Sequence, residues 1–194
     1  MTLARIRVDV EGHDNVPDMS GVIVAFNHLS FADPALVAVA MERHARRRVR
    51  FMAKAEALQW PVLGRLMRAY GGFGVRRGRL DRDAYRTARE VLRSTDWLGL
   101  APEGTRSRTG TLGAAHTGAV LLAQRTGATL LPVGISGSER VWPVGALLPR
   151  PGRRATLRIG EAYRPGTGNA EAETAELMRR IAALLPPAYR GMYG

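Results

Sequence analysis

The sequence predicts one α/β domain over residues 1–194, with a mostly parallel or mixed central sheet flanked by helices. Its 194 residues, 45% of them hydrophobic, suit a single globular core. Short runs rich in β-branched residues alternate with longer segments of helical periodicity, which is the pattern of an α/β sheet. No repeat, linker or low-complexity tract divides the chain, and we interpret the Arg- and Pro-containing stretch 149–154 as a surface loop.

The first half of the chain is expected to hold three strands and two helices. A β-branched run at residues 22–26 predicts a buried strand, and an apolar-rich helix follows at 34–43. The runs 49–53 and 73–75 predict two further strands. Residues 81–93 predict an amphipathic helix that places its apolar side chains on one side, at Ala84, Ala88, Val91 and Leu92.

The second half alternates in the same way. Residues 97–101 predict a strand, and 114–125 predict a helix that ends before Gly127, a plausible C-cap. The run 129–135 is the clearest buried strand in the sequence. A strand at 155–159 and a helix from about 170 to 185, ended by Pro186, complete the predicted domain.

The charge of the chain indicates an anionic partner. Lys and Arg outnumber Asp and Glu by 29 to 17, which gives a formal charge of +12, and nearly all of the cations are arginine. An arginine fork fits phosphate, so nucleic acid, phospholipid headgroups and phosphorylated small molecules are all candidates. A GC-rich genome is an alternative explanation of the arginine excess. The lack of cysteine excludes disulfides, thiolate metal sites and a cysteine nucleophile, and we expect no metal site.

The sequence also predicts where the protein resides. The N-terminus lacks an apolar run that would serve as a signal peptide, which predicts a cytoplasmic protein. No uncharged apolar stretch approaches the roughly 18 residues that a bilayer span requires. We therefore expect any membrane contact to be peripheral.

Polar loops follow four of the predicted strands. In open α/β sheets, ligands bind where loops leave the carboxyl ends of the strands. If the sheet is largely parallel, all four loops share one edge. They are residues 27–33 (NHLSFAD), 76–79 (RRGR), 102–108 (PEGTRSR) and 136–140 (SGSER).

The first of these loops holds His28 and Asp33, a candidate catalytic pair. On a regular helix their spacing places the side chains about 140° apart, so they can meet only where a loop turns into a helix. Asp33 followed by Pro34 marks such a start, with Asp33 at the N-cap and Pro34 at the first helical position. The carboxylate would then accept the Nδ1 proton of His28 and leave Nε2 free as a general base. The alternative is that Asp33 only caps the helix and His28 is an ordinary loop residue. Both roles are compatible if one carboxylate oxygen caps the helix and the other orients His28.

The third loop combines groups that suit a phosphate. Gly104 allows close backbone approach, Thr105 supplies a neutral donor, and Arg106 and Arg108 supply charged forks. The alternative is a polar turn in which Glu103 pairs with a neighbouring arginine.

Two familiar catalytic motifs are excluded because the sequence lacks residues that they require. The segment 134–138 resembles a nucleophile elbow, but its last position is Ser138 where glycine is required. A nucleotide phosphate loop needs a Gly-Lys-Ser/Thr ending, and the only lysine, Lys54, lies between two alanines. ATP chemistry is therefore not expected.

The motifs together resemble those of the lysophosphatidic acid (1-acylglycerol-3-phosphate) acyltransferases and related glycerolipid acyltransferases. The matching blocks occur in family order within about residues 20–140. They are Asn27-His28 to Asp33 (NHxxxxD), residues 51–56 (FMAKAE), residues 72–77 (GFGVRR, with the family's arginine at Arg77), residues 102–107 (PEGTRS) and Leu131-Pro132-Val133.

This resemblance implies a glycerolipid acyltransferase-like fold and a bacterial enzyme of phospholipid biosynthesis. The expected reaction moves a fatty acyl group from an acyl thioester, acyl-CoA or acyl carrier protein, to the free hydroxyl of a lysoglycerophospholipid, turning 1-acylglycerol-3-phosphate into phosphatidic acid. It needs no cofactor beyond the thioester, and no covalent serine or cysteine intermediate, because a thioester is already activated. The implied partners are the lysophospholipid, the acyl donor and an anionic membrane surface, here the inner face of the cell membrane, and not nucleic acid.

The resemblance also assigns roles to individual residues. His28 is the implied base and Asp33 its partner, and Pro132 and Val133 are expected to shape the acyl-donor region. The residues expected to bind substrate are Asn27, Arg77, Glu103, Gly104, Thr105 and Arg106.

Three features depart from the family pattern. Many relatives carry N-terminal hydrophobic helices, whereas this chain begins only a short way before the first block. Membrane binding is therefore expected to rest on the arginine run 43–50 or on the apolar loop 58–63 around Trp60, unless Trp60 packs in the core and the arginines are merely solvated. Ala115-His116 stands where a Phe-Lys pair is usual, which affects how tightly a phosphate is held from that side. Arg76 stands where an acidic residue is frequent, so the acceptor headgroup can differ.

Three other functions remain as alternatives. The chain can act on another lysolipid or glycolipid acceptor, or it can be a relative that binds lipid without catalysis. A basic nucleic-acid-binding protein is disfavoured, since only 6% of the residues are aromatic and no nucleic-acid motif is present.

Overall fold

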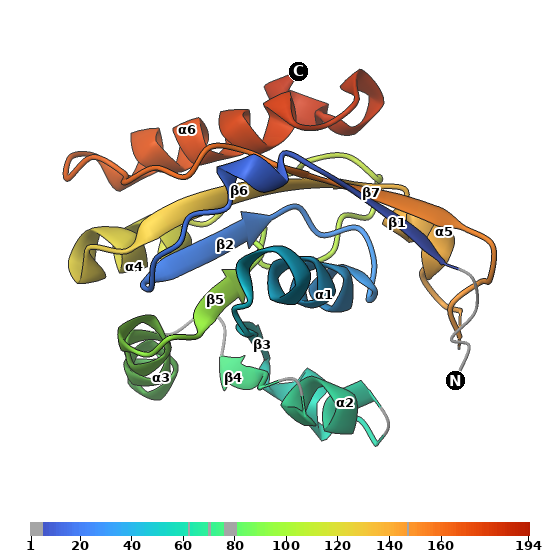
Figure 1. The fold of residues 1–194 in the computed structure, drawn as a ribbon, viewed down its shortest axis with the longest axis horizontal. Coiled ribbons are helices and arrows are strands. Elements are labelled where there is room, and N and C mark those ends of the chain that lie inside the picture. Colours follow the sequence, from blue (N-terminus) through green and yellow to red (C-terminus); the bar gives the residue numbers. More distant parts are fainter. Residues whose placement is uncertain (1–5, 62, 70, 76–80, 147) are drawn as a thin grey trace.

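A mixed β-sheet forms the centre of the computed structural model, which describes residues 6–61, 63–69, 71–75, 81–146 and 148–194. In these residues seven strands pair in the order β1-β7-β6-β2-β5-β3-β4 (Figure 1). The strands are β1 Arg7–Glu11, β2 Val22–Phe26, β3 Val49–Lys54, β4 Phe73–Val75, β5 Trp97–Leu100, β6 Thr129–Ser136 and β7 Arg154–Ile159. β6 and β7 are antiparallel and the other neighbours are parallel. The predicted fold class is therefore confirmed.

Helices cover both faces of the sheet. Side chains of α1 pack on one face, against Phe26, Leu131 and Leu157, whereas α3, α4 and α6 pack on the other, against Ile23, Leu98 and Leu130. Figure 1 shows α6 along one side of the sheet and α1 along the opposite side. The helices are α1 Asp33–Ala45, α2 Leu63–Ala69, α3 Arg82–Arg93, α4 Gly118–Thr126, α5 Ser138–Val141 and α6 Ala170–Ala183, with short 3-10 turns η1 His13–Asn15, η2 Ala55–Gln59, η3 Pro187–Tyr189 and η4 Gly191–Tyr193.

The direction of the strands brings the polar loops together. Since β6, β2, β5, β3 and β4 are parallel, their carboxyl ends lie at one edge of the sheet, to the right in Figure 1. The loops after β2, β5 and β6 therefore share this edge, as predicted. The remaining predicted loop, 76–79, lies outside the described residues. No helix within the described ranges combines the length and apolar character that crossing a bilayer requires.

Besides the short 3-10 turns, three elements were not predicted: β1, α2 and the one-turn α5, which occupies part of the predicted loop 136–140. β1 alternates exposed and half-buried residues, with Val8 and Val10 facing inward, and its partner β7 lies far along the chain, so only a distant pairing stabilises it. α2 begins at Leu63, and its second residue is Gly64. A Cβ on Gly64 would clash with the carbonyl oxygen of Leu58. Glycine is thus needed for close packing. Because glycine has a poor helix propensity, the sequence does not predict this helix.

One predicted helix begins later than expected. α4 starts at Gly118 instead of residue 114. The reason is a hydrogen bond of 2.9 Å from the His116 backbone N–H to the Pro102 carbonyl oxygen, which holds residues before the helix against the loop after β5.

Candidate active site

His28 and Asp33 form a direct pair at the carboxyl edge of the sheet. His28 Nδ1 lies 2.8 Å from Asp33 Oδ2, and the Asp33 side chain is fully buried. The backbone N–H groups of Leu29 and Ser30 donate to the same oxygen at 2.6 and 2.7 Å. Because a carboxylate only accepts, Nδ1 must carry the proton, which leaves the Nε2 lone pair free. The contact that the spacing predicted is therefore present.

The local helix start differs from the prediction. Ala32 occupies the N-cap and makes no side-chain cap, so Asp33 is the first helical residue and Pro34 the second. Asp33 does not cap the helix with one oxygen and orient His28 with the other, since Oδ2 takes all three donors. Ser30 shapes the turn instead, because its hydroxyl accepts from the Ala32 N–H at 3.1 Å and donates to the Trp142 carbonyl oxygen at 2.8 Å.

The loop after β5 is bound to the loop that carries His28. The Ser107 backbone N–H donates to the His28 carbonyl oxygen at 2.7 Å. Gly104 has a φ of +67°, and a Cβ there would lie 2.9 Å from Cδ2 of His116. Glycine is therefore required on two grounds, a left-handed backbone and close packing.

Glu103 is a buried carboxyl group beside the pair. It is 5% exposed, and burial together with the Asp33 charge raises its pKa to about 8, although hydrogen bonding to the His28 backbone acts in the opposite direction. Glu103 is therefore mostly protonated at neutral pH. Among the described residues no arginine forms a salt bridge with Glu103 and its Oε1 has no hydrogen-bond partner, contrary to the polar-turn alternative.

Arg106 is held by an aromatic ring. Its guanidinium carbon lies 3.6 Å from the centroid of the Phe31 ring, and within the described chain its Nη1 has no hydrogen-bond partner. Burial lowers the pKa of Arg106, and the nearby Asp33 charge raises it. The Arg106 guanidinium is stacked on a ring but has a free donor at Nη1 within the described chain, so it is available to bind an anionic ligand.

An apolar cavity of about 870 Å³ opens beside these residues. His28, Thr105 and Arg106 line its polar part, and it extends between α3 and α4 as far as Ala88 and Leu122. This volume and lining are those of a small-molecule site with a few convergent polar groups. An extended hydrocarbon chain fits such a lining.

Some predicted site residues have other roles in this geometry. Asn27 is 1% exposed, and its carboxamide exchanges hydrogen bonds of 2.8 and 2.7 Å with the backbone of Ile135. It thus fastens the end of β2 to β6 and does not line the cavity. Pro132 and Val133 lie buried in β6 opposite Ala25 and Phe26 and do not line the cavity. They can shape an acyl-donor site only indirectly, by setting the position of the strands. Arg77 lies outside the described residues.

Phe31 and Trp142 were not anticipated from the sequence, and His116 was noted only as a departure from the family pattern. Phe31 contacts Trp60 and Trp142 edge-on, with ring centroids 5.7 and 6.0 Å apart, and His116 packs over Gly104 and lines the cavity. The position of Trp142 shortly after a polar loop was a weak indication of a role in the site. Its contact with Phe31 could not be foreseen, because the two residues are distant in sequence.

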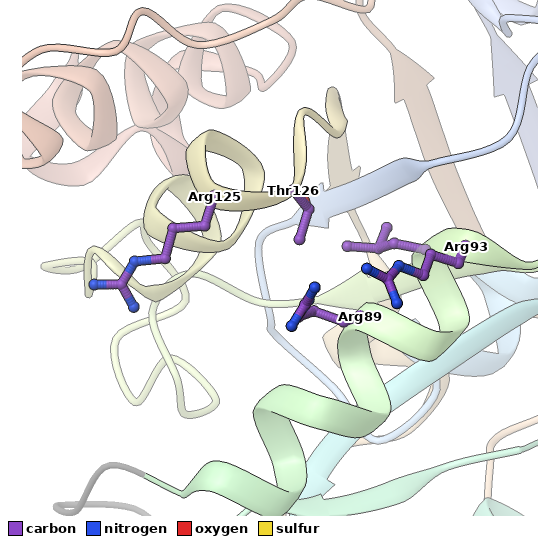
Figure 2. A pocket seen from close by; sticks show the side chains of 5 residues that line it. Arg89, Arg93, Arg125 and Thr126 are labelled. Carbon is purple, nitrogen blue, oxygen red and sulfur yellow. The ribbon is translucent and has the colours of Figure 1, made fainter.

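A second hollow, of about 130 Å³, lies one helical turn further along α3 and α4. Figure 2 shows Arg89, Arg93 and Thr126 around it, with Arg125 extending away. The Thr126 hydroxyl donates to the Leu122 carbonyl oxygen at 2.7 Å. This hollow holds neither a base nor a nucleophile, and within the described ranges no three His, Cys, Asp or Glu side chains converge as metal ligands.

The mixed sheet with a His-Asp pair beside an apolar cavity defines an α/β protein of the acyltransferase class. A family model described as Acyltransferase matches residues 7–136, and the chain belongs to this family.

Individual relatives agree with this assignment. The chain is 31% identical to a 1-acyl-sn-glycerol-3-phosphate acyltransferase of Borreliella burgdorferi over 68% of its length and 52% of the relative. It is 29% identical to a chloroplastic 1-acyl-sn-glycerol-3-phosphate acyltransferase of Arabidopsis thaliana, over 72% of this chain and 39% of that protein. The chain thus spans about half or less of these two relatives. The crystal structure of the 1-acyl-sn-glycerophosphate acyltransferase PlsC from Thermotoga maritima is similar, with a TM-score of 0.70 and 28% identity, over 90% of this chain and 69% of that one.

Proposed function

We propose that the protein transfers a fatty acyl group from an acyl thioester to the free hydroxyl of a lysoglycerophospholipid, with 1-acylglycerol-3-phosphate as acceptor and phosphatidic acid as product. The observation that carries the proposal is the His28-Asp33 pair beside an apolar cavity. The relatives named above act, by their names, on 1-acyl-sn-glycerol-3-phosphate, which supports this acceptor.

The proton balance follows from the tautomer of His28. Nε2 removes the proton of the acceptor hydroxyl while its oxygen attacks the thioester carbonyl carbon. The tetrahedral adduct then collapses, the carbon–sulfur bond breaks, and the leaving thiolate takes the proton back from the imidazolium. Asp33 holds the ring in place and stabilises the imidazolium. No acyl-enzyme is needed, and the proposed co-substrate is acyl-CoA or an acyl carrier protein, with no further cofactor.

The other site residues have supporting roles in this proposal. Arg106, stacked on Phe31, binds the acceptor phosphate together with Thr105, and the resemblance adds Arg77 to this set. Glu103, neutral at pH 7, places no second negative charge beside the phosphate. The acyl chain occupies the cavity towards Ala88 and Leu122. We propose that the enzyme works in the cytoplasm at the inner face of the cell membrane.

Mass spectrometry of the products tests the proposal directly. Purified protein is given acyl-CoA or acyl carrier protein with a mixed pool of lysophospholipids, and thiol release is followed in parallel. We expect phosphatidic acid to be the main acylated product. Acylation of another lysolipid would correct the acceptor, and the absence of any acylated product or thiol across both donors would contradict the activity.

A further inference from the structure

Exposed apolar side chains occur at the cavity and in a loop whose first residue, Trp142, lines it. Trp60 lines the cavity and is 45% exposed, which shows that the cavity reaches the surface there. Val144 and Leu148, in the loop after α5, are 67% and 76% exposed. Large apolar groups on the surface at a lipid-sized cavity indicate contact with an apolar partner.

Residues 142–146 and 148–150, here called the mouth loop, begin at the cavity wall and are held in shape by internal hydrogen bonds. The Trp142 indole N–H donates to the Ala146 carbonyl oxygen at 2.9 Å, and the Arg150 N–H donates to the Val141 carbonyl oxygen at 2.7 Å. Trp142 also lines the cavity and contacts Phe31, whose ring contacts Trp60. The Phe31 ring thus connects Trp142 of the mouth loop with the exposed Trp60.

Unpaired arginines accompany this apolar surface. Arg150 and Arg153 are exposed, and no carboxylate within the described chain pairs with them, whereas Arg140 and Arg154 have ion pairs with Glu139 and Asp9. Exposed arginines beside inserted apolar residues match an anionic lipid surface, where each contributes about fivefold to the partition coefficient.

The other predicted membrane site lies elsewhere. The run 43–50 ends α1 and begins β3, at the edge of the sheet opposite the cavity. Arg47 pairs with Asp18, and Arg48 and Arg50 donate to backbone carbonyl oxygens. A membrane held there would face away from His28.

We propose that the mouth loop and Trp60 dock on an anionic lipid bilayer, with Val144 and Leu148 inserted among the lipids and Arg150 and Arg153 at the headgroups. The inference rests on the proposed function only in that a lipid acceptor explains the need for docking. An acidic protein would satisfy the arginines but would leave Val144, Leu148 and Trp60 in contact with water or polar groups. The bilayer satisfies both, and it delivers an acyl chain straight into the apolar cavity.

Vesicle binding without turnover tests the proposal. Partition of the protein onto phosphatidylcholine vesicles, with and without phosphatidylglycerol, is measured for the wild type and for V144S/L148S. We expect the double variant to lose about tenfold or more in partition. V39S/M192S is the apolar control, because it removes two other exposed apolar side chains, at α1 and η4, and we expect it to bind as the wild type does.

A matched pair of charge variants tests the arginines. R150Q/R153Q should weaken binding to phosphatidylglycerol vesicles about tenfold or more and leave pure phosphatidylcholine binding unchanged. R89Q/R93Q removes the same charge from the hollow of Figure 2, and should have little effect.

The outcomes of these experiments separate docking from catalysis. Equal binding by V144S/L148S and the wild type would overturn the proposal, as would equal losses in V39S/M192S. Unchanged vesicle binding with a raised KM for acyl carrier protein alone would assign the mouth loop to a protein partner. Absence of thiol release by the wild type would contradict the proposed function, while a vesicle-binding difference between the variants would still stand. Unchanged thiol release from monomeric short-chain lysolipid confirms that V144S/L148S retains an intact site.

Discussion

The guanidinium carbon of Arg106 lies 3.6 Å from the centroid of the Phe31 ring. Phe31 belongs to the loop of His28, and Arg106 to the loop after β5. The contact therefore joins the proposed base and the proposed phosphate-binding residue into one unit, reinforced by the hydrogen bond from Ser107 to His28.

Replacing Phe31 with leucine should loosen Arg106. We expect KM for 1-acylglycerol-3-phosphate to rise roughly three- to tenfold, the scale of one cation–π contact, with little change in kcat. Phe31→Tyr, which keeps an aromatic ring under Arg106, should retain the wild-type KM. Steady-state kinetics decide the matter, and an equal effect on a neutral monoacylglycerol acceptor would show that Phe31 has no specific role towards phosphate.

Gly104→Ala should destabilise the protein through two separable effects. The left-handed backbone costs about 1–2 kcal/mol, and the new Cβ would lie 2.9 Å from the His116 ring. Gly127→Ala is a matched control, since Gly127 has a φ of +71° but nothing within 4 Å of its Cβ position. Urea denaturation should therefore show a larger loss for Gly104→Ala. Equal losses would mean that the His116 ring moves aside freely.

The raised pKa of Glu103 predicts a pH-dependent contribution to stability. The folded protein keeps the Glu103 proton up to about pH 8, whereas the unfolded chain releases it near the ordinary value of 4.5. The stability from this group is therefore complete below pH 4.5 and is lost as pH rises to about 8. Glu103→Gln removes the titration, so the stability of the variant relative to wild type should rise from pH 5 to pH 9. A difference that stays flat in urea denaturation across that range would show that Glu103 ionises normally.

Asn27 is predicted to act on stability more than on catalysis. Asn27→Ala leaves the buried N–H and carbonyl oxygen of Ile135 without their partner, which should cost about 2–4 kcal/mol. Asn15→Ala removes one partly buried hydrogen bond, to the Ile159 carbonyl oxygen, and should cost about 1 kcal/mol. If Asn27→Ala instead keeps its stability and loses most of its turnover, Asn27 contacts the substrate.

Much of the fold followed from local patterns. The buried run that became β6 and the amphipathic α3, capped by Asp81, depend on residues close in sequence. β1 could not be predicted, because its stability comes from pairing with β7 near the other end of the chain.

The same distinction between local and distant contacts applies to the candidate site. The contact of His28 with Asp33 was predictable because both residues belong to one turn. The aromatic support was not, since Phe31 and Trp142 meet only through the arrangement of β2 and β6. The N-cap prediction for Asp33 was wrong because the three donors converge on one oxygen, a detail that depends on the turn's exact backbone path.

The most direct test of the central claim is the rate of thiol release by His28→Ala with acyl-CoA and 1-acylglycerol-3-phosphate, with thermal melting to confirm folding. Loss of the base should lower kcat about a hundredfold to ten-thousandfold, with a melting temperature close to that of the wild type. A folded His28→Ala protein that keeps more than about a tenth of the wild-type rate would contradict the role of His28 as general base.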